Sequence, residues 1–197
     1  LSQMIKDDMK PALGVTEPGA IAFAVAKARS FTKGDIKKVN VAMNSGMYKN
    51  AFTCGIPNSN EVGNVFAAAL GVVAGNADKG LESLADVTPE DNVKAQEMID
   101  QGKITVELSG ITSRIFIEAT VETEEDKAIV TIRDSHTNIT KITVNDKVEL
   151  ETEDEKKTEE DGGEEEAHSI HKYTLQQLYD YVTTVDIEEI RFINEAY

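Results

Sequence analysis

The spacing of the apolar residues changes near residue 103, and this change limits the folds open to the chain. Before it, segments 17–31 and 61–74 are rich in Ala and Gly and apolar on all sides, a pattern typical of centrally buried helices. After it, apolar residues alternate with polar ones, as at Ile104, Val106 and Leu108, which is typical of half-buried strands. The sequence therefore predicts an α+β fold in which Ala/Gly-rich helices pack on a largely antiparallel β-sheet.

Shorter elements follow from the same patterns. The β-branched run at 36–43 predicts a strand, and the stretch 44–60, rich in Gly, Asn and Ser, predicts a long connection. Short turns such as Asn145-Asp146 separate the strands after residue 103, so these strands are expected to form an antiparallel meander. Helices are predicted over 1–10, 17–31, 61–74, 78–86 and 90–101, and from the capping residue Thr174 onward.

The charge is unevenly distributed and suggests a domain boundary. The chain of 197 residues has a formal net charge of -16, and residues 151–167 contain ten acidic residues and two lysines, a net of -8. Such a segment cannot build a packed core, so an acidic loop or linker is expected there. It would separate an N-terminal domain, 1–150, from the start of a second domain at 168–197. The strong negative charge argues against nucleic acid as a partner.

Cysteine content and hydropathy indicate the compartment. Cys54 is the only cysteine, which excludes an internal disulfide and fits a reducing environment. No segment has the roughly 20 consecutive apolar residues that a membrane-spanning helix needs. We therefore expect a cytoplasmic protein without a membrane partner. Both ends of the sequence fall within helical patterns, so we also expect the chain to be a piece of a longer protein.

The segment Lys10–Pro18 joins a loop to the predicted second helix. Gly14 permits an unusual turn, Thr16 is a suitable N-cap, and Pro18 fits the first helical turn. A buried helix N-terminus presents free main-chain N–H groups that attract an anion, such as an amino-acid carboxylate. A helix cap without any ligand explains the same residues.

Two further polar segments could line a site. In 54–60, Asn58 and Ser59 precede a buried helix and could either cap it or contact a ligand, while Cys54 is expected to be a small buried apolar residue. In 135–138, His136 is flanked by hydroxyl residues at a strand end, where an imidazole can move a proton or bind a carboxylate. An ordinary turn explains this second segment equally well.

Three blocks together resemble a known family. "KPALGVTEP" at 10–18 is similar to a "KPALGCTEP" signature, the stretch from "KNAFTCGIPNSN" to "GLESL" is similar to a second block, and "DSHTNITKI" is similar to an "HTNI" block. They occur in family order over roughly residues 1–145. On these motifs the chain resembles the iron–sulfur, pyridoxal-independent family of L-cysteine desulfidases and L-serine dehydratase alpha-chain-like proteins, and it resembles the N-terminal half only.

The resemblance implies a function and a set of roles. It implies an amino-acid lyase that carries out β-elimination on L-cysteine or L-serine, giving pyruvate, ammonia and, from cysteine, sulfide. It further implies a [4Fe-4S] cluster in the full-length protein and a missing C-terminal catalytic half whose first residues are 168–197, with a homo-oligomer possible. His136 would be the catalytic acid or base. The substrate would be bound by Gly14, Thr16, Glu17, Asn58, Ser59, Thr137 and Asn138.

The chain departs from the family pattern at one position. Val15 stands where the signature has a cysteine that is presumed to bind the cluster, and valine cannot ligate iron. An introduced substitution, a natural member with altered chemistry and an unusual ligand set would each explain it. No metal ligand and no cofactor are expected in this chain by itself. The first alternative function is therefore a non-catalytic amino-acid-binding or regulatory module, and the second is an interaction protein that uses its acidic segment.

Overall fold

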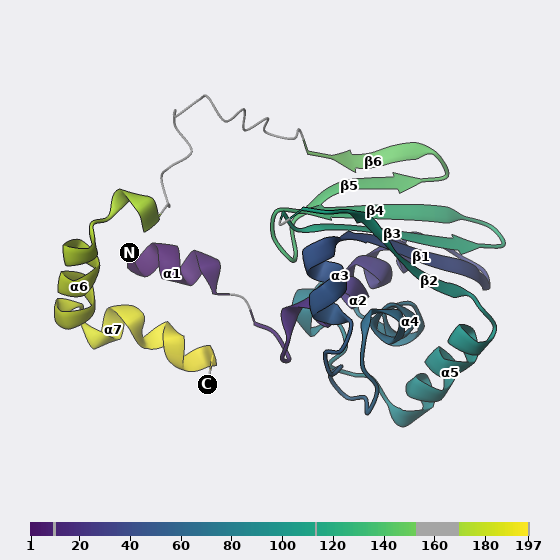
Figure 1. Cartoon of the computed structure of the whole chain (residues 1–197), viewed down its shortest axis with the longest axis horizontal. Coiled ribbons are helices and arrows are strands. Elements are labelled where there is room, and N and C mark those ends of the chain that lie inside the picture. Colours follow the sequence, from purple (N-terminus) through teal and green to yellow (C-terminus); the bar gives the residue numbers. More distant parts are fainter. Residues whose placement is uncertain (10, 113, 153–169, 197) are drawn as a thin grey trace. The chain divides into compact units, whose positions relative to one another are not determined.

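The computed structural model describes residues 1–9, 11–112, 114–152 and 170–196 (Figure 1). The chain divides into two compact units, Ala12–Asp154 and Leu1–Pro11 together with Glu155–Tyr197. The acidic segment predicted at 151–167 lies outside the described residues from 153 onward. The N-terminal segment differs from the predicted grouping, because residues 1–11 cluster with the C-terminal helices and not with the larger body.

The larger unit holds one mixed sheet and its helices. Its elements, in chain order, are α2 (Thr16–Arg29), β1 (Ile36–Asn44), α3 (Ser45–Ala51), α4 (Asn64–Ala74), the 3-10 helix η1 (Ala77–Glu82), α5 (Pro89–Asp100), β2 (Ile104–Gly110), β3 (Phe116–Thr123), β4 (Lys127–Arg133), β5 (Ile139–Val144) and β6 (Lys147–Glu151). The predicted α+β class, with Ala/Gly-rich helices on a largely antiparallel sheet, is confirmed.

The six strands have the order β2-β1-β3-β4-β5-β6. The predicted meander is correct from β3 to β6, where every neighbour is antiparallel. It is wrong for β2, which pairs in parallel with β1, Val39 opposite Ile104. Parallel neighbours need a long crossover, and the segment from α3 to α5 supplies it. The connection predicted at 44–60 is also partly wrong, because α3 occupies its first half.

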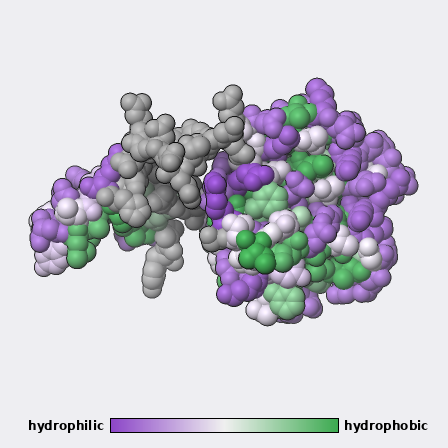
Figure 2. All heavy atoms as spheres, turned by 45° about the horizontal axis from the view of Figure 1, so that its top comes forward, coloured by the Kyte–Doolittle hydropathy of each residue, from purple (hydrophilic) through white to green (hydrophobic). Residues whose placement is uncertain are grey.

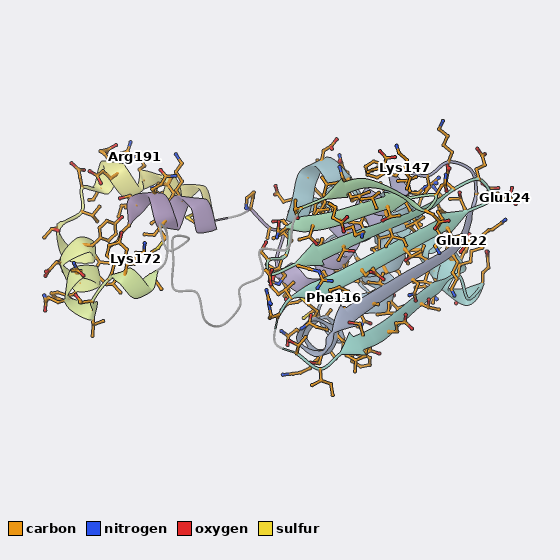
Figure 3. The ribbon with its side chains drawn as sticks, turned by 90° about the horizontal axis from the view of Figure 1, so that it is seen from above. Phe116, Glu122, Glu124, Lys147, Lys172 and Arg191 are labelled. Atoms are coloured by element: carbon orange, nitrogen blue, oxygen red, sulfur yellow. The ribbon has the colours of Figure 1, made fainter. Side chains whose placement is uncertain are left out.

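The core lies between one face of the sheet and the helices. Inward residues of the central strands, such as Val41, Ile117 and Val130, are fully buried, and α2 packs over β3 and β4 while α4 packs over β1 and β2. Figure 1 shows α5 farther from the sheet, beyond α4. Figure 3 looks onto the opposite face, where Phe116 and Glu122 mark the two ends of β3.

Helices α2 and α4 approach each other at glycines. A Cβ on Gly71 would lie 2.7 Å from the Ala22 carbonyl oxygen, and one on Gly75 would lie 2.7 Å from the Ala26 Cβ. Only glycine permits backbones to come this close, which explains why small residues fill both helices. Because residues 22 and 26 face 71 and 75 in the same order, the two helices run parallel.

The smaller unit consists of short helices. They are α1 (Ser2–Asp8), η3 (Ile170–Lys172), α6 (Leu175–Thr184), α7 (Ile187–Ile190) and η4 (Arg191–Ala196). The Ser2 hydroxyl lies 2.8 Å from the Tyr181 hydroxyl and donates to Glu189 at 3.3 Å, which accounts for the grouping of α1 with the C-terminal helices. Thr174 caps α6, as predicted, by accepting from the Gln177 N–H.

The hydropathy of the helices bears on membrane insertion. Over the described ranges, no helix is both long and apolar enough to cross a bilayer.

Candidate functional site

The topology gathers separate parts of the sequence at one edge of the sheet. Strands β1 and β4 point the same way, because each is antiparallel to β3. Helix α2 leads into β1 from the opposite direction, so its N-terminus lies near the end of β1, where α3 begins. The turn after β4, which carries His136, reaches the same edge. Since α4 is parallel to α2, its N-terminus lies at this edge as well.

Thr16 and His136 are in contact at this edge. Thr16 Oγ1 lies 3.5 Å from His136 Nε2 and donates to Glu17 Oε2 at 3.3 Å. Thr16 is not the N-cap that the sequence predicts; Val15 is the N-cap and has no side-chain cap bond, so Thr16 is the first helical residue. This shift by one residue leaves the Thr16 hydroxyl available to link the imidazole to the carboxylate.

Glu17 is held by groups from other elements. Its Oε1 accepts from Asn50 Nδ2 at 2.9 Å. Partial burial by itself would raise the pKa of the Glu17 carboxyl, but the Asn50 amide, its own main-chain N–H, the Thr16 hydroxyl and the charge of His136 together hold this pKa below its ordinary value. Glu17 is therefore a half-buried carboxylate that stays charged near neutral pH.

His136 sits on a turn fixed by its neighbours. The Asn138 side chain donates to the Arg133 carbonyl at 3.1 Å, and the Arg133 N–H donates to the Asn138 carbonyl at 3.1 Å. Asp134 has a positive φ of 65° and pairs with Arg114 at 2.8 Å. Asn138 is thus engaged in closing the turn, while His136 and Thr137 are half-buried.

The second predicted segment is tied to a different part of the body. Asn58 Nδ2 donates to the carbonyls of Leu84 and Ala85 at 2.9 and 3.0 Å, and the Ser59 hydroxyl accepts from the Glu61 N–H. Neither residue caps α4, whose N-cap is Gly63. Gly63 has a φ of 94°, and a Cβ there would lie 2.8 Å from the Phe52 carbonyl oxygen, so glycine is required.

The cluster at this edge therefore contains Thr16, Glu17, Asn50 and His136. Three of these residues were predicted, and Gly14 precedes them in an exposed loop with a φ of 145°. Asn50 was not predicted, because its only signal in the sequence is its place in the second block. The contacts of Asn58, Ser59 and Asn138 join them to other partners.

The donor set does not suit an iron–sulfur cluster held by this chain alone. Such clusters need several thiolates, and Cys54, the single thiol, donates to the Asn50 carbonyl at 2.7 Å. Cys54 is half-buried and not fully buried as predicted. Val15, at the signature position, is 48 % exposed. Within the described ranges, no three His, Cys, Asp or Glu side chains are grouped so that they could hold a metal ion.

The outer face of the sheet contains a separate polar recess. None of the predicted site residues takes part in it. Figure 2 views the molecule obliquely and shows a mostly hydrophilic surface on the body, with smaller hydrophobic patches. The recess is lined by Lys38, Asn40, Glu107, Thr120, Glu122 and Lys127.

Comparison with known proteins identifies longer relatives. A UPF0597 protein of Clostridium botulinum strain Hall is 35% identical over 195 residues, covering 98% of this chain and 45% of the relative. A UPF0597 protein of Caldanaerobacter subterraneus subsp. tengcongensis is 36% identical over 196 residues, covering 100% of this chain and 46% of the relative. The chain therefore spans about half the length of the curated relatives it matches.

These similarities extend over the whole chain but name no activity. The names of these relatives give neither a substrate nor a reaction. No family model matches the chain, and no solved structure matches it.

Proposed function

We propose that this chain is the substrate-binding part of a cytoplasmic amino-acid lyase that eliminates sulfide from L-cysteine or water from L-serine. The observation that carries the proposal is the contact between Thr16 and His136, 3.5 Å apart and 120 residues apart in the sequence. It joins two of the blocks on which the family resemblance rests. Glu17 and Asn50 extend the same cluster.

The cluster contains one group that can bind the substrate ammonium and another that can remove the proton from the α-carbon. The Glu17 carboxylate can bind the substrate ammonium group, because it stays charged at neutral pH and lies at an accessible edge. A neutral His136 imidazole can accept the Cα proton. Loss of that proton and of sulfide or water from Cβ gives 2-aminoacrylate, which hydrolyses to pyruvate and ammonia.

We assign departure of the leaving group to the part of the protein that relatives carry in addition. The single thiol of this chain does not suit a cluster, so none of its own residues is given that step. Helix α6 offers an apolar surface against which that additional part could pack. Its residues Leu175, Tyr179 and Val182 share one face and are 84, 62 and 68 % exposed. Apolar side chains at this spacing form a stripe that normally packs against another element.

The test is pyruvate formation by the complete protein. It should be prepared without oxygen and supplied with L-cysteine or L-serine, and pyruvate and sulfide should be measured. We expect turnover that falls at least a hundredfold in His136→Ala, since a general base contributes about 10²–10⁴-fold. A complete protein with bound L-cysteine and no pyruvate would rule out the lyase.

A non-catalytic amino-acid-binding module is the second candidate. The observation in its favour is Val15, an exposed aliphatic residue where the signature has cysteine. In that case, L-serine would bind to the complete protein, Glu17→Gln would weaken this binding, and neither amino acid would be consumed. Turnover in the assay above would exclude this candidate.

A further inference from the structure

The N-termini of α2 and α4 lie at the same end of a close pair of parallel helices. Gly71 lies against Ala22 and Gly75 against Ala26, so at both contacts the residue of α4 lies beside the residue 49 positions earlier in the chain. Continued toward the N-termini, this relation places Asn64 at the level of Val15. The first turns of both helices therefore lie at the same edge as the Thr16–His136 contact.

Asn64 projects from the side of α4 that faces α2. It is seven residues before Gly71 and eleven before Gly75, and residues at these intervals share one face of an α-helix. Its side chain is 3% exposed. The Oδ1 atom accepts from the Val65 N–H at 3.0 Å, which holds the carboxamide over the first turn of α4.

The other half of this carboxamide has no partner. Asn64 Nδ2 is buried and makes no hydrogen bond within the described chain. Asn44, which is equally buried, shows the usual arrangement: its Nδ2 donates to the Thr112 carbonyl at 2.9 Å and its Oδ1 accepts from the Phe116 N–H at 3.1 Å. A buried donor without an acceptor destabilises a fold, so Asn64 calls for an explanation beyond packing.

The first turn of α4 also has main-chain donors without acceptors. Gly63 and Val15, the N-caps of α4 and α2, make no side-chain cap bond. Within the described chain, the N–H groups of Asn64 and Phe66 find no acceptor. A helix N-terminus with free N–H groups favours an anion, and here it is joined by a buried amide donor on the same turn.

The charges around this edge select the kind of anion. The donors are neutral amides, and the nearest charged group of the cluster is the Glu17 carboxylate, which would repel a phosphate or a dicarboxylate. It would attract an ammonium group. A ligand with one carboxylate and an adjacent ammonium group satisfies both sets of groups, which describes a zwitterionic α-amino acid.

We propose that Asn64 and the first turn of α4 bind the α-carboxylate of an amino acid whose ammonium group is bound by Glu17. This inference rests on the proposed substrate class and assigns the carboxylate a site. Nδ2 is closed to solvent, so the ligand must displace a neighbour to reach it. Residues 11–15, which precede α2, are exposed, and we assign the displacement to this loop.

The test compares two ligands that differ only in the carboxylate. L-serine and ethanolamine are titrated into the chain and into Asn64→Leu, which keeps the size of the side chain and removes its donors. We expect L-serine to bind about tenfold or more weakly to the variant, because hydrogen bonds to a charged group are lost. The affinity for ethanolamine should not change. The variant should also melt at a higher temperature, since an unpartnered buried donor has been removed.

Ser83→Ala is the matched control. Among the residues that the structure describes, the Ser83 hydroxyl is the other buried side-chain donor without a partner, and it lies outside the face shared by Asn64, Gly71 and Gly75. Its removal should leave both affinities unchanged. The inference is overturned if the wild-type chain does not prefer L-serine over ethanolamine, or if Asn64→Leu keeps that preference. If the preference depends on Asn64 but the complete protein makes no pyruvate, the lyase proposal fails and the carboxylate site stands.

Discussion

At the scale of single residues, the account depends on Glu17 remaining charged. Its hydrogen bonds come from Thr16, next to it in the chain, and from Asn50, 33 residues away. The sequence could indicate that Thr16 and Glu17 begin a helix. It could not indicate that Asn50 reaches them, because one asparagine in a stretch predicted as a connection carries no pattern, and only the path of β1 and α3 brings it there.

Removing the Asn50 amide should raise the pKa of Glu17 toward its ordinary value. The bond from Asn50 is the largest of the contributions that lower this pKa, so Asn50→Ala removes the main support for the charge. Carbon-13 NMR of the side-chain carboxyl across an acid titration measures the midpoint. Gln96→Ala, whose amide donates to Asp100 on α5, is the control and should leave the midpoint in place. An unchanged midpoint in Asn50→Ala would contradict the assigned contact.

The same carboxyl links stability to pH. A carboxyl whose pKa is lower in the folded than in the unfolded state contributes stability above the unfolded pKa, and this contribution is lost as the pH falls through the folded pKa. Glu17→Gln should therefore reduce the loss of stability on acidification below about pH 4.5, the ordinary value. Urea unfolding at pH 7 and at pH 3.5 measures this. An equal loss in the variant and the wild type would show that the charged form of Glu17 does not stabilise the fold.

At the scale of elements, the close pair α2–α4 sets the position of both helix N-termini. Both helices could be predicted, because long Ala- and Gly-rich segments leave few alternatives. Helix α3 could not, since its seven residues include Ser, Gly and Asn and the helix is fixed by burial of Met47 and Ala51. The pairing of β2 with β1 could not be predicted either. Alternation of apolar and polar residues shows which side of a strand is buried, but not which strand lies next to it.

A methyl group between α2 and α4 should destabilise the fold. Gly71→Ala would place its Cβ 2.7 Å from the Ala22 carbonyl oxygen and 2.8 Å from its Cα, both main-chain atoms that cannot rotate away. We expect a loss of about 1–3 kcal/mol in the free energy of unfolding, measured with urea. Gly55→Ala meets nothing within 4 Å and should change stability by less than about 0.5 kcal/mol. Similar values for both variants would argue against the close approach.

At the scale of the whole molecule, the two units differ in what holds them together. All buried members of the main core cluster fall between Ala20 and Ile142, inside the larger unit. In the described part of the smaller unit, α6 and α7 contain no buried residue. No pattern in the sequence would group α1 with the C-terminal helices, because that grouping rests on contacts between distant residues, among them the hydroxyl bonds of Ser2 and the position of Lys6 Nζ over the Phe192 ring.

The larger unit should fold without the rest. A fragment of Ala12–Asp154 keeps the whole core cluster, so it should unfold in a single cooperative transition and retain the amide NMR shifts of the β3–β6 meander. Thermal unfolding followed by circular dichroism, with the 197-residue chain as the reference, measures this. A fragment that lacks a cooperative transition would show that the smaller unit is needed to hold the sheet and helices together.

The central claim is that the edge formed by Thr16, Glu17, Asn50 and His136 binds an amino acid. The most direct measurement is a titration of the nitrogen-15-labelled chain with L-serine, followed residue by residue in amide spectra. The account predicts saturable shifts that are largest at Thr16, Glu17, Asn64 and His136. Shifts confined to the outer-face recess around Asn40 and Glu122, or no saturable shift at any concentration, would contradict it.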